Sequence, residues 1–390
     1  MEHNFTWKND GRTKVMIGCG TRPEIIRLAA VIKRCREYFD CCVVYYNQNW
    51  DRNLSTVFWE DFELKNTFGE YGPDILVPVV GENLGVTCGN IMGRSYELLS
   101  ELQPEGYLVL GDTNSALSAI SAKRLKVPIF HMEAGNRCWD WNVSEMINRK
   151  IVDHISDINM PYTENSRRYL LSEGIDGKTI FVTGSPMREV LRHAMPGIEK
   201  SDVLERLGLE KGKYILVSAH REENIDLEDN FFSLMNAINH MAETYQVPVI
   251  YSTHPRSRKF IEQRHFQFHP LVRSLPPFGL FDYNHLQMNS LVVLSDSGTL
   301  SEESAMLGFC GVLIRTSTER PEVLDKGTVV IGGITQESVQ QAAELAIAMQ
   351  AAGEPRAMPL DYEDVNVGAK VVKLIQSYTP IVNETVWLKR

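Results

Sequence analysis

The chain has 390 residues, of which 43% are hydrophobic and 23% are charged, and these values are ordinary for a globular protein. This length exceeds the usual size of a single hydrophobic core, so we expect two domains. The formal net charge of −10 argues against general binding of nucleic acids or of acidic membrane surfaces.

Cysteine and histidine usage excludes two further classes. The seven cysteines are odd in number and form no CxxC pair, so neither a disulfide framework nor a zinc site is expected. The histidines show no HExxH spacing. The N-terminal residues lack the apolar core of a signal peptide, and no apolar run approaches the ~18 residues of a membrane span. We expect a cytoplasmic protein that uses no metal and no cofactor.

Short apolar runs alternate with longer amphipathic stretches along the first half of the chain. The predicted strands are Val15–Ile17, Cys41–Tyr46, Tyr107–Leu110, Ile129–His131, Ile158–Met160 and Ile180–Val182. The predicted helices are Glu24–Tyr38, Val86–Leu102, Ala116–Leu125, Ile147–Ile155 and Asn165–Glu173. Short, continuously apolar strands joined by helices are typical of parallel sheets that are covered on both faces.

The second half repeats this alternation. The predicted strands are Tyr214–Val217, Val247–Tyr251, Leu271–Leu275, Leu291–Leu294, Val312–Ile314 and Val329–Ile331. The predicted helices are Leu227–Glu243, Leu300–Leu307 and Val367–Tyr378. The pattern therefore predicts an α/β protein with two doubly wound, Rossmann-like domains that face each other across a central cleft, where ligands of such sheets bind.

The domain boundary is expected near Met195-Pro196-Gly197, where the pattern pauses in a polar stretch that contains proline. The predicted N-terminal domain comprises residues 1–194 together with a C-terminal helix at about 367–390. The predicted C-terminal domain comprises residues 195–366.

Polar residues follow several predicted strands. Gly20-Thr21-Arg22-Pro23 comes after the first. By itself this segment favours a plain strand-to-helix turn with a surface arginine, and the alternative is that Arg22 and an open helix N-terminus receive a phosphate. Asp112 follows a later strand, either as a catalytic carboxylate or as a helix N-cap.

The segment from His131 to Arg149 contains the highest density of candidate catalytic and binding residues. Glu133 and Glu145 lie near the asparagine-arginine pairs Asn136-Arg137 and Asn148-Arg149. Acids beside arginines at the end of a strand indicate proton transfer next to an anionic substrate. Two nearby tryptophans, Trp139 and Trp141, would either stack on a sugar or base or pack in a core or interface.

The second half carries comparable segments. His220 follows a strand and is placed for acid–base chemistry or for phosphate binding, and His254 resembles it at the next strand. Ser297-Gly298-Thr299 precedes a helix that contains Glu303. This segment predicts a diphosphate cradle with an acid for a ribose, or a capping box with Thr299 as the cap.

Taken together, these segments resemble the non-hydrolysing UDP-N-acetylglucosamine 2-epimerase family, which has a GT-B scaffold. The motifs that carry the resemblance are GTRPEIIR (20–27), GDTNS (111–115), HMEAGNR (131–137), SEMINR (144–149), GSP (184–186), AHREEN (219–224), HP (254–255), DSGTLSEE (296–303) and TERPE (318–322). They keep the family's order and span nearly the whole chain.

The resemblance extends to one branch of the family. NRCWDWNVSEMINRKIVDHISDIN, GSPMREVL and IRTSTERPEVLDKG look like the branch that makes UDP-N-acetyl-L-fucosamine by epimerising C2 of a UDP-linked 2-acetamido-2,6-dideoxy-L-hexose from L-talo to L-fuco. Such a product would serve surface polysaccharide synthesis. A sister activity converts the L-rhamno sugar to L-quinovosamine.

The resemblance implies roles for individual residues. It assigns catalysis to Asp112, Glu133, Glu145 and His220, and contacts to substrate or UDP to Arg22, Arg27, Arg149, His254, Ser297, Gly298, Thr299, Glu303 and Arg320. It also implies a UDP-sugar substrate, a homodimer, and a mechanism of UDP elimination and re-addition that needs no metal.

Two positions depart from the family pattern. The family reads Pro-Glu-Glu where this chain has Ser144-Glu145-Met146. Asn49-Trp50 stand where the hexosamine branch tends to carry His. The alternatives are therefore a UDP-N-acetyl-L-rhamnosamine 2-epimerase, a UDP-GlcNAc/UDP-ManNAc 2-epimerase, a GT-B glycosyltransferase and a non-catalytic nucleotide-sugar-binding protein.

Overall fold

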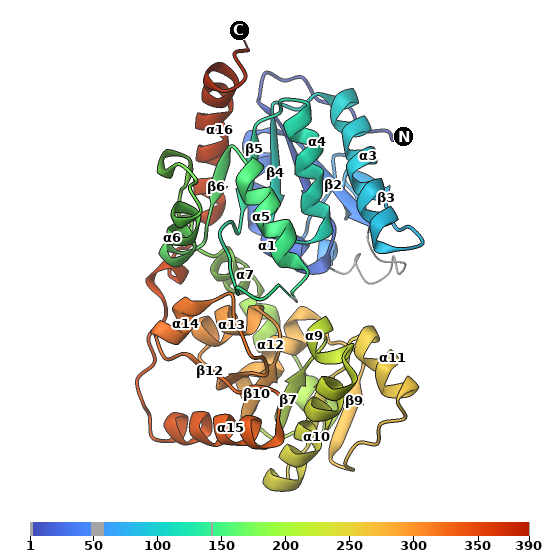
Figure 1. Ribbon diagram of the computed structural model, residues 1–390, viewed down its shortest axis with the longest axis vertical. Helices are drawn as coiled ribbons and strands as arrows, with labels where there is room; N and C mark the ends of the chain where they lie inside the picture. Colours follow the sequence, from blue (N-terminus) through green and yellow to red (C-terminus); the bar gives the residue numbers. More distant parts are fainter. Residues whose placement is uncertain (1–2, 48–57, 142, 390) are drawn as a thin grey trace. The chain divides into compact units, whose positions relative to one another are not determined.

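The computed structural model describes residues 3–47, 58–141 and 143–389, and it divides the chain into two compact units (Figure 1). Unit 1 comprises Met1–Val190 and Glu363–Arg390, and unit 2 comprises Leu191–Tyr362. Asn49-Trp50 lie outside the described residues. No helix in the described part of the chain is both long and apolar enough to cross a membrane.

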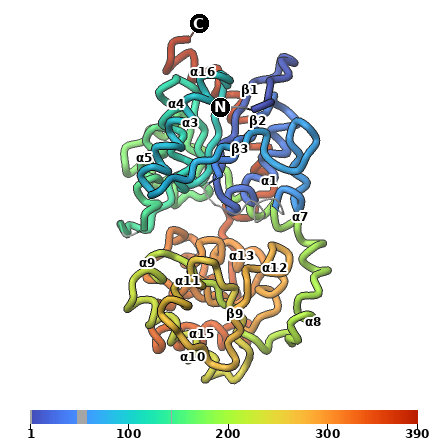
Figure 2. Tube along the Cα trace, turned by 90° about the vertical axis from the view of Figure 1, so that its right-hand side faces the viewer, coloured from blue at the N-terminus to red at the C-terminus, as the bar shows by residue number. Residues whose placement is uncertain are grey.

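Unit 1 contains a six-stranded parallel sheet in the order β3-β2-β1-β4-β5-β6. Its strands are β1 (Lys14–Cys19), β2 (Asp40–Asn47), β3 (Ile75–Pro78), β4 (Gly106–Leu110), β5 (Ile129–Met132) and β6 (Ile158–Met160). Its helices are α1 (Arg22–Tyr38), α3 (Leu84–Leu102), α4 (Ser118–Arg124), α5 (Glu145–Ile155), α6 (Glu164–Ser172) and α16 (Val367–Thr385), with the 3₁₀ turns η1 (Asn114–Leu117) and η2 (Gly177–Thr179). Figure 2 shows α3, α4 and α5 on one side of β1–β3 and α1 on the other, and α16 packs against α1.

Unit 2 contains a second six-stranded parallel sheet in the order β12-β11-β10-β7-β8-β9. Its strands are β7 (Ile215–Ser218), β8 (Val249–Ser252), β9 (Val272–Leu275), β10 (Val292–Ser295), β11 (Gly311–Leu313) and β12 (Val329–Ile331). Its helices are α8 (Val203–Leu207), α9 (Glu222–Ile225), α10 (Glu228–Tyr245), α11 (Pro255–Gln263), α12 (Leu280–Asn289), α13 (Thr299–Leu307), α14 (Pro321–Asp325) and α15 (Gln336–Ala351), with the 3₁₀ turn η3 (Leu360–Tyr362). The helix α7 (Met187–Glu199) contains the division between the units.

The alternation of side chains along the strands divides each core into two layers. In β7, Ile215 and Val217 belong to a cluster with residues of α10 and α15, whereas Leu216 belongs to the cluster that contains Leu300 of α13 and Val323 of α14. Successive strand residues point to opposite faces, so a strand that is covered on both faces is apolar at every position. This confirms the predicted class of two doubly wound parallel sheets.

One local prediction is wrong. Ile180–Val182 does not form a strand, because only Ile180 pairs with the edge strand, through a single bridge to Asn159. The division between the units falls after Val190, a few residues before the expected boundary near Met195-Pro196-Gly197, and both positions lie inside α7. Leu191, Ala194 and Ile198 are buried along that helix, and apolar packing at this spacing outweighs one proline near the end of a helix.

Several elements escaped prediction. The edge strand β3 is four residues long, ends in Pro78 and leaves Leu76 exposed, so its sequence carries little strand signal. The helices α11, α12, α14 and α15 were also missed. Of these, α11 and α14 begin at prolines, Pro255 and Pro321, which suit a first helical turn.

Candidate active site

The predicted site residues of each unit follow neighbouring strands at the carboxyl edge of its sheet. In unit 1 the adjacent strands β1 and β4 flank the switch point of the strand order, and Arg22 and Asp112 come directly after them. In unit 2 the adjacent strands β7 and β10 do the same, followed by His220 and Ser297. Doubly wound sheets bind ligands at such points.

Glu133 is the first residue after β5 and has a left-handed backbone with φ of 63°. A residue other than glycine in this region stores strain, and such strain concentrates at functional sites. Its carboxylate contacts Nη1 of Arg27 at 3.0 Å and accepts a hydrogen bond from the amide of Asn136 at 3.1 Å. Its side chain is 12% exposed. These two contacts therefore hold the Glu133 carboxylate in place, and its side chain remains partly exposed to solvent.

Asp112 pairs with a different arginine. Its Oδ2 accepts a short hydrogen bond from Nε of Arg149, and its backbone carbonyl accepts one from Asn148 at 2.9 Å. The following turn, η1, is capped at Thr113. Asp112 therefore does not serve as the helix N-cap, and its ion pair accounts for its position.

Glu145 begins α5, four residues before Arg149, so the two side chains share one face of the helix. Glu145 is half-buried and accepts a hydrogen bond from the hydroxyl of Ser144 at 3.1 Å. Met146, which stands where the family has a second glutamate, is buried with Cys138 and Val143. Its sulfur lies 3.7 Å from Nη1 of Arg149.

Glu24, which the sequence analysis missed, links the turns after β1 and β4. Its buried carboxyl accepts hydrogen bonds from Gly20 N (3.1 Å) and from the hydroxyls of Thr21 (2.7 Å), Thr113 (3.0 Å) and Ser115 (2.7 Å). Burial raises the pKa of Glu24 to about 7, although these four donors oppose the shift. Arg22, two residues earlier, is half-buried at the start of α1.

In unit 2, the buried carboxylate of Asp296 organises the loop that carries His220. Its Oδ2 accepts hydrogen bonds from the backbone N–H groups of His220 and Arg221, each at 2.9 Å, and from the amide of Asn224 at 3.1 Å. The His220 side chain remains 39% exposed. Its ring centroid lies 5.3 Å from that of His254, so two imidazoles stand side by side.

The Ser297-Gly298-Thr299 segment leads into the N-terminus of α13. The hydroxyls of Ser297 and Thr299 lie 3.0 Å apart. A Cβ on Gly298 would lie 3.0 Å from Oε1 of Glu319, so the approach is too close for a larger residue. Gly298, without a side-chain cap, precedes the helix. The capping box with Thr299 as the cap is therefore wrong. Ser297 instead accepts hydrogen bonds from the backbone N–H groups of Thr299 (3.3 Å, at its hydroxyl) and Leu300 (3.2 Å, at its carbonyl) at the start of the helix.

Buried charges surround this segment. Glu303 accepts a hydrogen bond from Gln287 at 2.7 Å, and Arg320 pairs with Glu302 at 3.1 Å. Glu319 bridges two arginines, with Arg221 at 2.8 Å and Arg315 at 2.7 Å. This network of ion pairs stabilises the loops that follow β10 and β11.

The two tryptophans after β5 are exposed, with 55% and 65% of the surface of Trp139 and Trp141 accessible, so core packing does not explain them. The ammonium of Lys150 lies 5.6 Å from each ring centroid.

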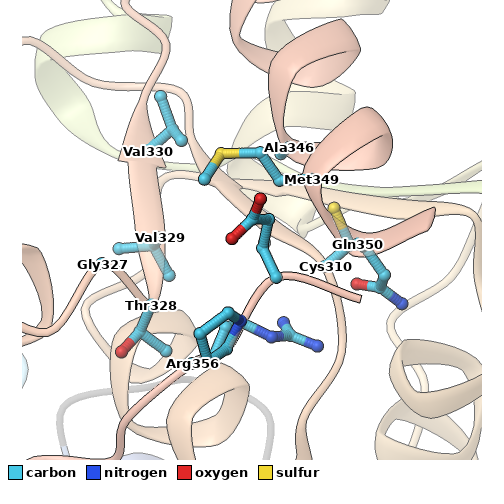
Figure 3. A pocket seen from close by; sticks show the side chains of 12 residues that line it. Cys310, Gly327, Thr328, Val329, Val330, Ala346, Met349, Gln350 and Arg356 are labelled. Carbon is cyan, nitrogen blue, oxygen red and sulfur yellow. The ribbon is translucent and has the colours of Figure 1, made fainter. Parts of the chain in front are cut away.

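Unit 2 contains a small cavity with a volume of about 60 Å³. Its lining includes Cys310, Met349 and Arg356 (Figure 3). It lies at the amino ends of β11 and β12, because Gly311 and Val329 begin those strands. It is thus at the edge of the sheet opposite the candidate site. In the described residues, no group of three or more His, Cys, Asp and Glu side chains is arranged to hold a metal ion.

The strand orders and the polar residues at the switch points define the class. They are those of a GT-B-like protein built from two Rossmann-like units, each with a ligand-binding edge. The structure resembles that of UDP-N-acetylglucosamine 2-epimerase from Rickettsia bellii, with 38% identity, a TM-score of 0.87 and coverage of 97% of this chain and 100% of the other. A structure of the Methanocaldococcus jannaschii UDP-GlcNAc 2-epimerase in complex with UDP-GlcNAc and UDP has a TM-score of 0.84 at 27% identity, over 93% and 99% of the two chains.

The family model for UDP-N-acetylglucosamine 2-epimerase matches residues 33–376. The chain therefore belongs to the UDP-N-acetylglucosamine 2-epimerase family and is an isomerase, which supports a UDP-sugar 2-epimerase activity. A relative from Pseudomonas aeruginosa, the UDP-2,3-diacetamido-2,3-dideoxy-D-glucuronate 2-epimerase, is 29% identical over 339 residues, which cover 86% of this chain and 92% of the relative.

Proposed function

We propose that this enzyme epimerises C2 of a UDP-linked 2-acetamido-2,6-dideoxy-L-hexose, converting the L-talo to the L-fuco sugar. The observation that carries the proposal is the segment from Asn136 to Asn159, whose sequence resembles the L-fucosamine branch. In this segment the buried Met146, whose sulfur accepts a hydrogen bond from Nη1 of Arg149, stands where the family has an acid. An apolar group beside the substrate-side arginine suits a sugar of lower polarity than a hexosamine.

The chemistry requires groups that move protons on both faces of C2. The C2–H bond is not acidic, because no carbonyl is attached to C2. In the proposed mechanism a base removes the C2 proton while the C1–O bond to UDP breaks, which leaves a glycal-type enol ether. A proton then reaches C2 from the opposite face, and UDP adds back to C1. Asp112, Glu133 and Glu145 supply the carboxylates for these transfers.

The departing UDP carries new negative charge, which unit 2 is built to receive. His220, His254 and the hydroxyls of Ser297 and Thr299 at the N-terminus of α13 would donate hydrogen bonds to it, and the helix dipole would favour its charge. Glu303 would accept hydrogen bonds from the ribose hydroxyls, and Arg320 would hold the loop. In unit 1, Arg22, Arg27 and Arg149 would orient the sugar and its phosphates.

The nearest alternative is an activity on UDP-GlcNAc, because relatives carry that name. The Pseudomonas aeruginosa relative, named for a different sugar, fits a family that accepts several substrates, among them the L-rhamno sugar. A glycosyltransferase would not need carboxylates for both faces of C2, and a protein that only binds nucleotide sugars would need none.

The decisive experiment incubates the enzyme with UDP-2-acetamido-2,6-dideoxy-L-talose, its L-rhamno isomer and UDP-GlcNAc in deuterated water. We expect deuterium at C2 of the L-talo and L-fuco sugars, with UDP retained in the product. Deuterium exchange at C2 of UDP-GlcNAc alone would show that UDP-GlcNAc, rather than the L-talo sugar, is the substrate. UDP release that depends on an acceptor would instead show a transferase.

The Glu133→Gln variant tests the assigned chemistry. We expect C2 exchange to fall by about 100-fold or more, because a general base contributes roughly 10²–10⁴-fold, while UDP binding stays close to that of the wild type. Glu97→Gln on the exposed face of α3 is the matched control and should exchange normally. Unchanged exchange in Glu133→Gln would remove Glu133 from the mechanism.

A further inference from the structure

His131 is buried in β5, two residues before Glu133, and is 1% exposed. Its Nδ1 lies 2.9 Å from Oδ1 of Asp153, and its Nε2 lies 2.9 Å from the backbone carbonyl oxygen of Gly111. A carboxylate and a carbonyl oxygen can only accept hydrogen bonds, whereas a neutral imidazole carries a proton on one nitrogen alone. Acceptor oxygens 2.9 Å from both ring nitrogens are the surroundings expected of an imidazolium cation, with Nε2 hydrogen-bonded to Gly111 and Nδ1 in an ion pair with Asp153.

The surroundings of His131 favour this charge. Burial disfavours the cation, but the hydrogen bond and the negative charge of Asp153 outweigh burial, with help from the Gly111 carbonyl and Asp112, and the pKa of His131 is raised. The pKa of Asp153 is lowered in turn, because His131 and Arg137 outweigh its burial. Arg137, which has no assigned role from the sequence, contacts Asp153 at 2.8 Å and Glu173 at 2.7 Å. Cationic and anionic side chains therefore alternate along this row of contacts, in the order His131, Asp153, Arg137 and Glu173.

His131 joins the three segments that carry the proposed catalytic carboxylates. The carbonyl that it binds belongs to Gly111, the residue before Asp112, and β5 leads directly to Glu133. Its anion Asp153 lies on α5, eight residues after Glu145, and also accepts hydrogen bonds from Gly135 N at 3.2 Å.

The turns that His131 joins lie close together. The N–H of Gly111 donates to the carbonyl of Met132 at 2.9 Å. A Cβ on Gly111 would stand 3.4 Å from Oε2 of Glu133. The N–H and the carbonyl of Gly111 are therefore both hydrogen-bonded to residues of β5. A shift of this turn would move Asp112 relative to Glu133.

We propose that His131 is a positioning residue: a permanently charged imidazolium that clamps the turn of Asp112, the turn of Glu133 and the helix of Glu145 into one arrangement. Its effect on turnover rests on the proposed function, because these carboxylates matter to the rate only if they transfer the protons. Its charge state does not rest on that function, which allows the two to be tested separately.

Nuclear magnetic resonance of ¹⁵N-histidine-labelled enzyme tests the charge state. We expect one histidine, identified by its absence from the spectrum of His131→Gln, to show two protonated ring nitrogens throughout the neutral pH range. The exposed His265 provides a reference signal from a solvent-accessible ring. An unprotonated ring nitrogen on His131 at neutral pH would overturn the proposal, whatever the enzyme acts on.

Two substitutions separate the contacts. His131→Gln places an amide N–H near the position of Nε2, toward Gly111, and His131→Asn places one near Nδ1, toward Asp153; both remove the cation. We expect kcat for C2 exchange to fall by roughly 100-fold in each, as for a displacement of about 1 Å in a catalytic group. KM and UDP affinity should change little, because no UDP contact is removed.

His154→Asn is the matched control, since His154 is an exposed histidine beside Asp153, and it should keep the wild-type kcat. A wild-type kcat in both folded His131 variants would overturn the positioning role. If the His131 variants do not fold, a wild-type spectrum in which no histidine carries two protonated ring nitrogens at neutral pH would still overturn the proposed charge state. If the wild-type enzyme exchanges no UDP-sugar, the proposed function fails while the spectrum is unaffected.

Discussion

Individual buried ionisable groups hold the loops that contain the candidate site residues of each unit, and Glu24 is the clearest case. All four groups that hydrogen-bond to its carboxyl are neutral: one backbone N–H and three hydroxyls. Since no cation compensates for the lost hydration among these contacts, the pKa rises to about 7 from an ordinary value of 4.5.

Glu24 should therefore make stability depend on pH. The folded state binds this proton more tightly than the unfolded state, so the contribution is present below the unfolded pKa and is lost as pH rises from about 4.5 to about 7. The loss amounts to ~3 kcal/mol. In Glu24→Gln, the amide oxygen can accept from Gly20 N while the amide N–H donates to Ser115, and the loss should vanish.

Urea denaturation of both proteins between pH 4.5 and 8 measures this difference. The wild type should lose stability relative to Glu24→Gln as pH rises through that range. Parallel pH profiles for the two proteins would contradict the assignment of a raised pKa to Glu24.

Glu319 in unit 2 differs from Glu24, because two arginines flank its buried carboxylate. Glu319→Ala would leave the guanidinium groups of Arg221 and Arg315 buried without their shared anion. Breaking a buried pair in this way costs about 3–5 kcal/mol. We expect urea denaturation to show a loss of this size, whereas Glu228→Ala, at an exposed position on α10, should change the free energy of unfolding by less than about 0.5 kcal/mol.

At the scale of elements, the central strands and the edge strands β6, β9 and β12 were predictable, whereas the edge strand β3 was not. The continuous burial of β1 and β4 leaves an apolar run that local sequence reveals. The edge strand β3, the bridge at Ile180 and the helix α7 follow instead from what packs beside them. Partners remote in sequence decided these elements, and no local pattern records them.

Glycines in two elements should respond oppositely to alanine. A Cβ on Gly18 in β1 would stand 2.2 Å from the hydroxyl oxygen of Tyr107, whereas one on Gly89 in α3 would contact nothing within 4 Å. Gly18→Ala should lower the free energy of unfolding by about 1–3 kcal/mol through overpacking. Gly89→Ala should raise it by about 0.4–1 kcal/mol, because alanine restricts the unfolded chain.

Thermal unfolding of the two single variants checks both signs. A stabilising Gly18→Ala would show that the Tyr107 hydroxyl moves aside at no cost. A destabilising Gly89→Ala would show that the face of α3 at Gly89 packs closely against something in solution, such as a second copy of the chain.

At the scale of the whole molecule, the chain returns to its first unit at its C-terminus. The helix α16 buries Val371, Ile375 and Val382 in unit 1. Lys370 donates a hydrogen bond to the carbonyl of Thr183 at 3.0 Å, and the backbone N–H of Gly368 donates to Glu189 at 3.2 Å. Unit 1 therefore contains both ends of the chain.

Truncation after Tyr362 should accordingly damage unit 1 rather than unit 2. Each apolar side chain lost from the core removes ~1.5–3 kcal/mol, so the loss of Val371, Ile375 and Val382 alone removes about 5–9 kcal/mol, which is comparable to the whole free energy of unfolding of a typical domain. Limited proteolysis should degrade residues 1–190 of the truncated chain and leave a resistant fragment at about 191–362. Equal resistance of both regions would refute a structural role for α16 in unit 1.

The sequence by itself determined the class of fold and which residues follow the strands, because hydrophobic periodicity and strand-end motifs are properties of neighbouring residues. The tertiary structure alone decided how the charges pair: Arg27 with Glu133, Arg149 with Asp112, and His131 with Asp153. It also decided that residues 195–197 are helical and that Glu24 bridges two turns. Pairing of this kind depends on which strands become neighbours in the sheet, and that is set by packing across the whole unit rather than by any local run of residues.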